Sequence, residues 1–322
     1  MTPEKKDNPI ALVALGGHAF MERGQKGTID EHEANAAKIC EALMLLVDRG
    51  YNLVITHGNG PQVGNLLLQN EAAGTGVPAM PLDILVAQTE GSLGYILQQA
   101  LLNQLRRRDI GRYVVTVVTQ VQVDPDDPAF QNPTKPIGPF LSQAEAERRA
   151  KDLGWSIVED SGRGWRRRVA SPRPTKIIQR HTIRDTAKQG HIVIAGGGGG
   201  IPIMKDKVTG DYKGIEAVID KDHTGALLAH EIGAELFVIL TEVDEVYLHF
   251  GKPEQRALGA LTIEMAARLI AEGHFPPGSM GPKMEAVLHF LEGGGKRALI
   301  TSPTHLPQAL DGAGGTHFVG RC

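Results

Sequence analysis

An apolar run leads directly into a glycine turn in the stretch Ile10-Ala11-Leu12-Val13-Ala14-Leu15-Gly16-Gly17-His18. The same order recurs where residues 53–56 lead into His57-Gly58-Asn59-Gly60-Pro61-Gln62, and where residues 192–194 lead into Ala195 and the glycines 196–200. Short aliphatic runs predict buried strands, and glycine lets backbone N–H groups turn toward a ligand at the start of a helix. For any one turn alone, the glycines could be required only by a tight connection between strand and helix, without a ligand. Three such turns on one parallel sheet indicate a site for a ligand with more than one phosphate group.

Length and composition favour a globular α/β protein. The 322 residues suffice for one large domain or for two lobes that share a sheet, and 41% of them are hydrophobic. The formal net charge of −3 gives no basic field for a nucleic-acid partner, and no apolar run approaches the roughly 18 residues of a membrane span. Cys40 and Cys322 form no disulfide framework, so we expect a cytoplasmic protein, with the polar residues 1–8 as a frayed tail.

Strand and helix patterns alternate along most of the chain, which predicts an α/β fold with a mainly parallel sheet covered by helices. Strands are expected at residues 10–15, 53–56, 113–123, 191–195, 236–240 and 297–301. Helices are expected at residues 31–49, from Pro61 onward, and at 82–108, 224–232, 262–271 and 283–291. Ligands of such sheets bind outside the carboxyl ends of the strands, where the glycine turns lie.

Residues 124–174 interrupt this alternation. The segment is rich in proline and contains Trp155, Trp165 and the basic run Arg166-Arg167-Arg168. A long irregular insertion in a compact domain is more often functional than idle, so we interpret the segment as a small lobe or lid. The basic run, like that at 106–108, is expected to be a solvated face or a lid contact.

Three lysines lie in glycine-, proline- or acid-rich contexts, where flanking turns can direct a side chain. They are Lys135 in Asn132-Pro133-Thr134-Lys135-Pro136, Lys221 in Ile219-Asp220-Lys221-Asp222, and Lys283 in Gly278-Ser279-Met280-Gly281-Pro282-Lys283. Phosphoryl transfer needs such cations around the transferring group, together with Mg²⁺ on the nucleotide. Any one of these lysines, taken alone, is more often a surface residue. Asp220 and Asp222 could orient Lys221 or approach Mg²⁺, and Asp222 also suits a helix N-cap.

The segment 241–247 follows the expected strand 236–240 and would lie at the same edge of the sheet. Tyr247 could pack on a nucleotide base or be a buried structural residue. The chain lacks a Gly-Lys-Ser/Thr phosphate loop, a His or Cys pattern with metal-ligand spacing, and a Gly-x-Ser-x-Gly turn. These absences argue against an ordinary P-loop protein, a metal site of that kind and an α/β-hydrolase.

Taken together, the motifs resemble those of the carbamate kinase family. The resemblance runs from about Ile10 to Ser302 and rests on several long strings, which are Val13-Ala14-Leu15-Gly16-Gly17, His57-Gly58-Asn59-Gly60-Pro61-Gln62-Val63-Gly64-Asn65, Asn132-Pro133-Thr134-Lys135-Pro136-Ile137-Gly138-Pro139-Phe140, Gly162-Arg163-Gly164-Trp165-Arg166, the segment 196–202, Glu216-Ala217-Val218-Ile219-Asp220-Lys221-Asp222, and Pro277-Gly278-Ser279-Met280 with Lys283.

The resemblance implies the amino acid kinase fold, a three-layer α/β/α sandwich with a small protruding subdomain, in a homodimer. Residues 1–322 would form one domain, with an acceptor-side lobe at 1–190 that includes the lid at about 124–174, and a nucleotide-side lobe at 191–322. The implied reaction is reversible phosphoryl transfer between MgATP and carbamate, giving carbamoyl phosphate and ADP. Its usual setting is ATP synthesis in arginine catabolism.

The resemblance also implies roles for particular residues. Carbamoyl phosphate would bind at Gly16, Gly17, His18, Gly58, Asn59 and Gly60. Lys135, Lys221 and Lys283 would surround the transferring group, with Asp222 organising the lysines. The nucleotide would contact Gly198, Gly199, Thr241, Val243, Asp244, Tyr247 and Met280. Mg²⁺ would arrive with the nucleotide, and no protein metal ligand is assigned.

Two positions distinguish this chain. Many amino acid kinases carry a lysine where this chain has Ala14, so Lys135 in the lid is the natural source of the missing cation. His18 stands where the family usually has asparagine, a neutral donor, whereas imidazole can become cationic near its usual pKa of about 6.5. Two alternatives remain at this point, an amino acid kinase with another carboxylate or phosphate acceptor, and a non-catalytic nucleotide or anion sensor on the same fold.

Overall fold

The computed structural model describes residues 8–22, 24–73, 76–160, 162 and 164–320, without the side chain of His18. Arg163, Cys322 and all but Asn8 of the expected N-terminal tail therefore lie outside the described residues. Among the helices within those ranges, none has the length and apolar character needed to cross a membrane.

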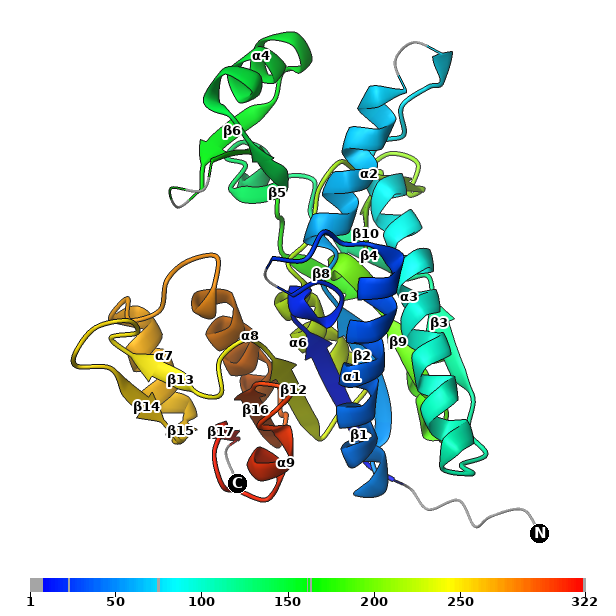
Figure 1. The fold of residues 1–322 in the computed structure, drawn as a ribbon, viewed down its shortest axis with the longest axis vertical. Helices are drawn as coiled ribbons and strands as arrows, with labels where there is room; N and C mark the ends of the chain where they lie inside the picture. The colour runs from blue at the N-terminus through cyan, green and yellow to red at the C-terminus, as the bar shows by residue number, and fades with distance from the viewer. Residues whose placement is uncertain (1–7, 23, 74–75, 161, 163, 321–322) are drawn as a thin grey trace.

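An eight-stranded sheet forms the centre of the molecule, in the order β15-β17-β16-β12-β1-β2-β9-β3 (Figure 1). Strand β1 (Ile10–Leu15) runs parallel to β2 (Asn52–His57) on one side and to β12 (Leu236–Leu240) on the other. Strands β17 and β15 run opposite to the other six, because β17 pairs antiparallel with β16 and parallel with β15. The remaining strands of this sheet are β3 (Val114–Val117), β9 (Ile192–Ala195), β15 (Ala260–Thr262), β16 (Arg297–Thr301) and β17 (Thr316–Val319). The first and second halves of the chain thus share one sheet.

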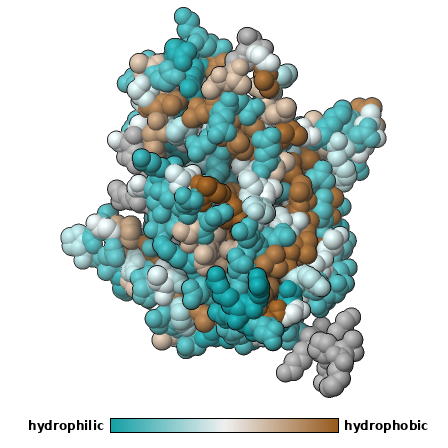
Figure 2. All heavy atoms as spheres, turned by 45° about the vertical axis from the view of Figure 1, so that its right-hand side comes forward, coloured by the Kyte–Doolittle hydropathy of each residue, from teal (hydrophilic) through white to brown (hydrophobic). Residues whose placement is uncertain are grey.

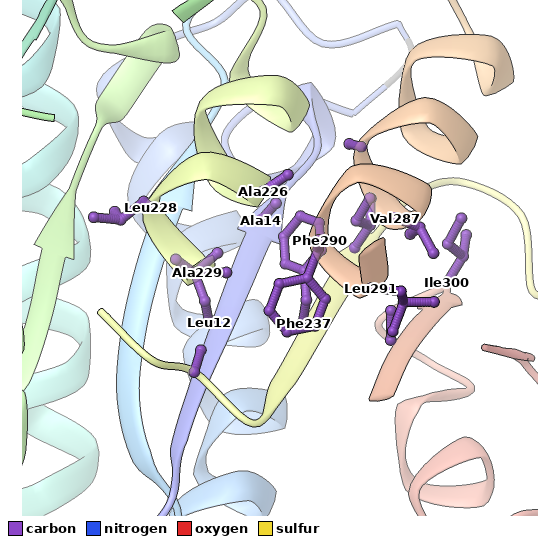
Figure 3. Packing of buried hydrophobic residues seen from close by; sticks show 14 of the residues in the cluster. Leu12, Ala14, Ala226, Leu228, Ala229, Phe237, Val287, Phe290, Leu291 and Ile300 are labelled. Carbon is purple, nitrogen blue, oxygen red and sulfur yellow. The ribbon is translucent and has the colours of Figure 1, made fainter. Parts of the chain in front are cut away.

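Helices cover both faces of the sheet because alternate side chains of its buried strands point to opposite sides. Leu12 and Ala14 of β1 pack with residues of α5 (Arg180–Lys188), α6 (Lys221–Glu231), α7 (Ile263–Ala271) and α8 (Met280–Glu292). Figure 3 shows this side, with Phe237 of β12 against Phe290 of α8, their ring centroids 5.5 Å apart. Val13 and Leu15 pack on the other side with α1 (Ile29–Asp48), α3 (Leu82–Arg107) and α9 (Leu306–Leu310). The predicted three-layer α/β/α sandwich is confirmed.

The single strand predicted at 113–123 is wrong, because the chain leaves the sheet at Thr119. Beyond it, β4 (Gln120–Val123) joins a second sheet in the order β11-β10-β4-β8, with β8 (Pro174–Ile177), β10 (Ile201–Lys205) and β11 (Tyr212–Gly214). Thr119 is fully buried, and its N–H donates to Oε2 of Glu90 at 2.8 Å instead of to a strand. Residues 113–123 have strand propensity throughout, but the hydrogen bond from Thr119 to Glu90, which is distant in sequence, interrupts the strand.

The insertion forms a small body of its own, which we call the lid. Its sheet has the order β5-β7-β6, built from β5 (Lys135–Leu141), β6 (Ser156–Glu159) and β7 (Trp165–Val169), with α4 (Gln143–Leu153) alongside. The lid stands away from the main sheet beside the upper part of α2 (Gly60–Ala72) (Figure 1). A Cβ on Gly64 of α2 would lie 2.2 Å from Cα of Gly138 in β5, so glycine is required for this close approach.

The second half of the chain also carries a two-stranded hairpin of β13 (Val246–Leu248) and β14 (Arg256–Leu258). It follows β12, next to α7, at the side of the molecule away from α3 (Figure 1). Buried Val246 and Leu248 anchor it in the same core as α7 and α8.

Candidate active site

Two of the glycine turns meet at the carboxyl ends of β1 and β2, as the parallel order requires. The N–H of Gly16 donates to the carbonyl of Leu240 at 3.0 Å, and the N–H of Gly58 donates to the carbonyl of Leu15 at 3.1 Å. A Cβ on Gly58 would lie 3.7 Å from the backbone nitrogen of Gly17 and 3.4 Å from Cδ of Lys221. The Gly17 and Gly58 turns and the Lys221 side chain therefore lie together.

Asn59 and Gly60 begin α2, with Asn59 at the N-cap position and Pro61 in the first turn. The side chain of Asn59 is buried, and its Nδ2 donates to Oγ1 of Thr89 at 2.8 Å. The amide nitrogen of Asn59 is thus committed to the protein interior. The side chain of Asn59 holds the turn, while the backbone N–H groups at the start of α2 remain suited to an anion.

The third glycine turn, 196–200, packs against the second, at 57–60. Gly198 and Gly199 are buried, and both have positive φ angles, 68° and 95°. A Cβ on Gly198 would lie 2.1 Å from Nδ2 of Asn59, and one on Gly199 would lie 2.2 Å from the carbonyl oxygen of Ile219. In this structure both glycines permit close backbone packing, so their contact with a nucleotide stays a prediction.

The buried carboxylate of Asp222 bridges two of the three lysines. Oδ1 lies 2.6 Å from Nζ of Lys221 and Oδ2 lies 3.1 Å from Nζ of Lys283. Helix α6 begins at Lys221 and α8 begins at Met280, so both lysines sit in the first turn of a helix. The helix predicted at 283–291 begins three residues earlier, at Met280, and the interpretation of Asp222 as a helix N-cap was wrong. Asp220 is the N-cap, and it accepts the N–H of Asp222 at 2.9 Å.

Lys135 reaches this cluster from the lid, at the start of β5. Its Nζ lies 3.1 Å from Oδ2 of Asp220 and donates to the carbonyl of Ile219 at 3.2 Å. Residues from β5, α6 and α8 thus bring three ammonium groups and two carboxylates to one place. The net charge of this cluster is positive, as a phosphate site needs.

The charges within the cluster determine its protonation. Burial alone would raise the pKa of Asp222, but Lys221 and Lys283 outweigh it and hold this pKa below its usual range. Burial would likewise lower the pKa of Lys221, but Asp222 and Asp220 raise it. The pKa of Lys283 is lowered, first by burial and then by repulsion from Lys221. Asp222 therefore keeps Lys221 charged, and Lys283 is the cation most readily lost.

The segment from Thr241 to Tyr247 lies at the carboxyl end of β12, at the same edge of the sheet. Thr241 donates its N–H to the carbonyl of Thr301 at 2.9 Å, and Val243 and Asp244 follow it, half-buried. Tyr247 lies in β13, half-buried, with its ring centroid 5.9 Å from that of Phe250. Met280 begins α8 and packs against the core that holds Val246.

Sequence reasoning missed two side chains at this edge. Oγ of Ser302 donates to Oδ1 of Asp244 at 2.6 Å, and Nδ1 of His305 lies 2.7 Å from the same oxygen. Ser302 directly follows β16 and His305 lies four residues beyond its end, so the rule that ligands bind at strand carboxyl ends could have found them. Asp220 was weighed only as a partner of Lys221, and the structure makes it the partner of Lys135 as well.

Nothing is described of the His18 side chain, and its predicted contact stays a prediction. In the residues that the structure describes, no group of three or more His, Cys, Asp or Glu side chains could hold a metal ion.

Comparison with known proteins shows the family. A model of the amino acid kinase family matches residues 9–302. The chain belongs to the amino acid kinase family. It is 47% identical over 311 residues to the carbamate kinase of Thermococcus kodakarensis, covering 96% of this chain and 98% of that protein. It is 48% identical over 310 residues to the carbamate kinase of Pyrococcus furiosus, covering 96% and 98%.

Solved structures agree. The carbamate kinase of Giardia lamblia bound to AMP-PNP superposes with a TM-score of 0.90 at 38% identity, covering 98% of this chain and 99% of that one. Within the amino acid kinase family this chain therefore groups with the carbamate kinases, and it is a phosphotransferase. The predicted family resemblance and enzyme class are confirmed.

Proposed function

We propose that this chain catalyses reversible phosphoryl transfer between MgATP and carbamate, forming ADP and carbamoyl phosphate. The observation that carries the proposal is the position of Lys221, which lies beside the Gly17 and Gly58 turns and shares the Asp222 carboxylate with Lys283. Two glycine turns and two ammonium groups thus lie together at the carboxyl ends of the strands. The relatives named carbamate kinase support this substrate.

Phosphoryl transfer in this site needs positioning and charge more than covalent help. A carbamate oxygen attacks the γ-phosphorus of ATP, the O–P bond forms, and the bond from that phosphorus to the β–γ bridging oxygen breaks. The bridging oxygen keeps the electron pair and leaves with ADP. Lys135, Lys221 and Lys283 stabilise the negative charge that spreads over the transferring oxygens. The turns at Gly16, Gly17, His18, Gly58 and Gly60 orient the carbamoyl group, and Asn59 fixes the last turn.

Thr241, Val243, Asp244, Tyr247 and Met280 are proposed to bind the nucleotide, with AMP-PNP bound to the Giardia lamblia relative in support. Mg²⁺ is proposed to enter as part of that nucleotide and to neutralise charge on its phosphates. The donor set fits this arrangement, because both carboxylates of the cluster are already bound to ammonium groups. Mg²⁺ coordination is therefore left to phosphate oxygens and water.

The lid is proposed to be catalytic and to belong with an acceptor-side lobe at 1–190, with the nucleotide-side lobe at 191–322. Ala14 is fully buried in the core and supplies no cation, whereas Lys135 of the lid reaches the cluster. Lid opening would withdraw Lys135 and admit substrates.

A homodimer is proposed on the face formed by α3 and β3. Strand β3 ends the eight-stranded sheet, and large hydrophobic side chains are exposed on both elements or beside them, namely Tyr95, Leu102, Tyr113, Val115 and Val118. Figure 2 brings this side forward and shows apolar side chains among hydrophilic ones there. An unpaired edge and an apolar face suit a second copy of the chain. Light scattering that gives the mass of one chain at micromolar concentration would contradict the dimer.

The direction of the reaction is proposed to be ATP synthesis in the cytoplasm, within arginine breakdown. The decisive experiment measures ATP formed from ADP, Mg²⁺ and carbamoyl phosphate by the purified protein, with Lys221→Ala as the control. Turnover that disappears in the control supports the reaction and the site together. A folded, nucleotide-binding protein without turnover would favour another acceptor or a sensor instead.

A further inference from the structure

Glu90, on the buried side of α3, is an acid without a charged partner among the residues that the structure describes. Its side chain is 2% exposed, and Oε2 accepts the N–H of Thr119 at 2.8 Å. Its other oxygen, Oε1, is buried and has no hydrogen-bond partner among the described residues. A buried polar atom left unsatisfied is unusual and destabilising, so its presence calls for a physical reason.

Thr119, which bonds to Glu90, also bonds to both ends of the third glycine turn. Oγ1 of Thr119 accepts the N–H of Gly196 at 2.9 Å, and the carbonyl of Thr119 accepts the N–H of Ile201 at 2.8 Å. One threonine therefore fixes both ends of the turn 196–200. Glu90 in turn fixes the backbone of that threonine.

The same turn of α3 also holds the acceptor side of the site. Thr89, next to Glu90, accepts Nδ2 of Asn59 at 2.8 Å. Gly197 lies between the two regions, because a Cβ there would be 2.5 Å from Nε2 of His57 and 3.3 Å from Cγ of Glu90. A shift of Glu90 would therefore reach the turn at 57–60 through packed neighbours.

We propose that Glu90 is a positioning residue, held as the neutral carboxylic acid, which keeps the glycine turn 196–200 packed against the acceptor turn at 57–60. This inference rests on the proposed function of that turn. Glu90 touches no substrate, and it acts through Thr119 and the glycines.

The surroundings of Glu90 favour the neutral form. Burial raises its pKa well above the usual range, although the Thr119 N–H opposes this. His57 faces the same glycine from β2, and burial lowers its pKa to about 4, so it carries no compensating charge at neutral pH. The other polar side chains in contact with this region are uncharged, namely Thr56, Asn59, Thr89, Thr119 and Thr224. Ionisation of Glu90 would place an unpaired charge beside the turn.

The test compares two substitutions with one matched control. Glu90→Gln keeps the shape, the neutral state and an acceptor for Thr119, so kcat should stay within about twofold. We expect the wild type to lose activity as rising pH ionises Glu90, and we expect this loss to be smaller in Glu90→Gln. Glu90→Ala removes the acceptor and should raise KM for carbamoyl phosphate about tenfold, with a smaller rise in KM for ADP, whose predicted contacts include Gly198 and Gly199. Glu231→Gln is the control, because Oε2 of Glu231 also accepts a backbone N–H, from Ile177 at 3.1 Å. Glu231 is the last residue of α6, seven residues beyond Thr224, which bonds to the glycine turn. Glu231→Gln should alter neither KM.

Several results would overturn the inference. A tenfold or larger fall in kcat for Glu90→Gln would show that the carboxylate must be ionised. An unchanged pH profile in Glu90→Gln, or equal changes in both KM values for Glu90→Ala, would leave only a general structural role. A second measurement does not depend on activity. Glu90 keeps its proton in the folded state, whereas the unfolded state releases it above about pH 4.5. The equilibrium constant for unfolding of the wild type should therefore rise with pH by up to about tenfold per pH unit, relative to that of Glu90→Gln. Absence of this difference refutes the neutral acid even if the proposed reaction is wrong.

Discussion

Replacing Asp222 by asparagine tests the charge balance of the site most directly. The carboxylate lies 2.6 Å from Nζ of Lys221 and 3.1 Å from Nζ of Lys283, and its side chain is only 3% exposed. Asparagine has nearly the same shape but no charge. The substitution therefore removes two ion pairs and leaves the packing almost intact.

The distances allow an estimate of the effect. At an effective dielectric constant of about 20, each pair is worth roughly 5–6 kcal/mol of Coulomb energy, before desolvation is subtracted. Breaking a buried pair usually lowers the free energy of unfolding by about 3–5 kcal/mol, because a charge is left uncompensated. Lys283 can relieve this by losing its proton, since its pKa is already lowered by burial and by Lys221. The variant is then expected to fold with one cation fewer in the site.

The expected kinetic result is a fall in kcat of about 10²–10³, the usual effect of removing one group that stabilises the transition state. KM for ADP should change little. A lysine with a lowered pKa is charged only below that pKa, so the activity of the variant should be lost at lower pH than that of the wild type as the pH rises. The assay is ATP formation from ADP and carbamoyl phosphate across a pH series. Asp126→Asn is a matched control, because Asp126 pairs with Lys207 on the exposed surface. A kcat within about threefold of wild type with an unchanged pH profile would refute the organising role of Asp222.

Three further substitutions test separate parts of the site. Lys135→Ala should lower kcat by about 10²-fold in the same ATP assay, and near-normal turnover would make the lid only structural. Gly198→Ala should lower the free energy of unfolding in urea by about 2–4 kcal/mol, because its Cβ would lie 2.1 Å from the Asn59 amide at a φ of 68°. Gly17→Ala, where the space is open, should change this free energy little. Equal effects of the two substitutions would contradict the reasoning. His18→Asn should retain activity, and a collapse of turnover in the folded variant would give His18 a catalytic role of its own.

The fold was predictable because its signals are local. Buried parallel strands are continuously apolar, and β1 shows this over its whole length. Each glycine turn follows such a strand, so their meeting at one edge of the sheet followed from the parallel order. The sandwich and the meeting of the Gly17 and Gly58 turns therefore came from patterns within a few residues of one another.

The remaining features depend on partners that sequence spacing does not reveal. No glycine or proline marks Thr119, and the strand ends there because Glu90, Gly196 and Ile201 bond to it. Asp220 and Asp222 are two residues apart, and either could cap a helix. Only the start of α6 at Lys221 decides that Asp220 does so. Lys135 and Asp220 are likewise brought together by the path of the lid, which no local pattern describes.

The position of Ala14 explains why the lid carries a catalytic cation in the proposed site. Ala14 is fully buried and packs in the same core as Ala226 of α6, so a methyl group occupies the place where a lysine would begin (Figure 3). The cation arrives instead from β5, and in this structure it rests on Ile219 and Asp220, directly before Lys221. To reach a phosphoryl group, Lys135 must exchange these partners for phosphate oxygens, which a dianionic ligand favours. Substrate binding and the position of the lid are thus linked through one ammonium group.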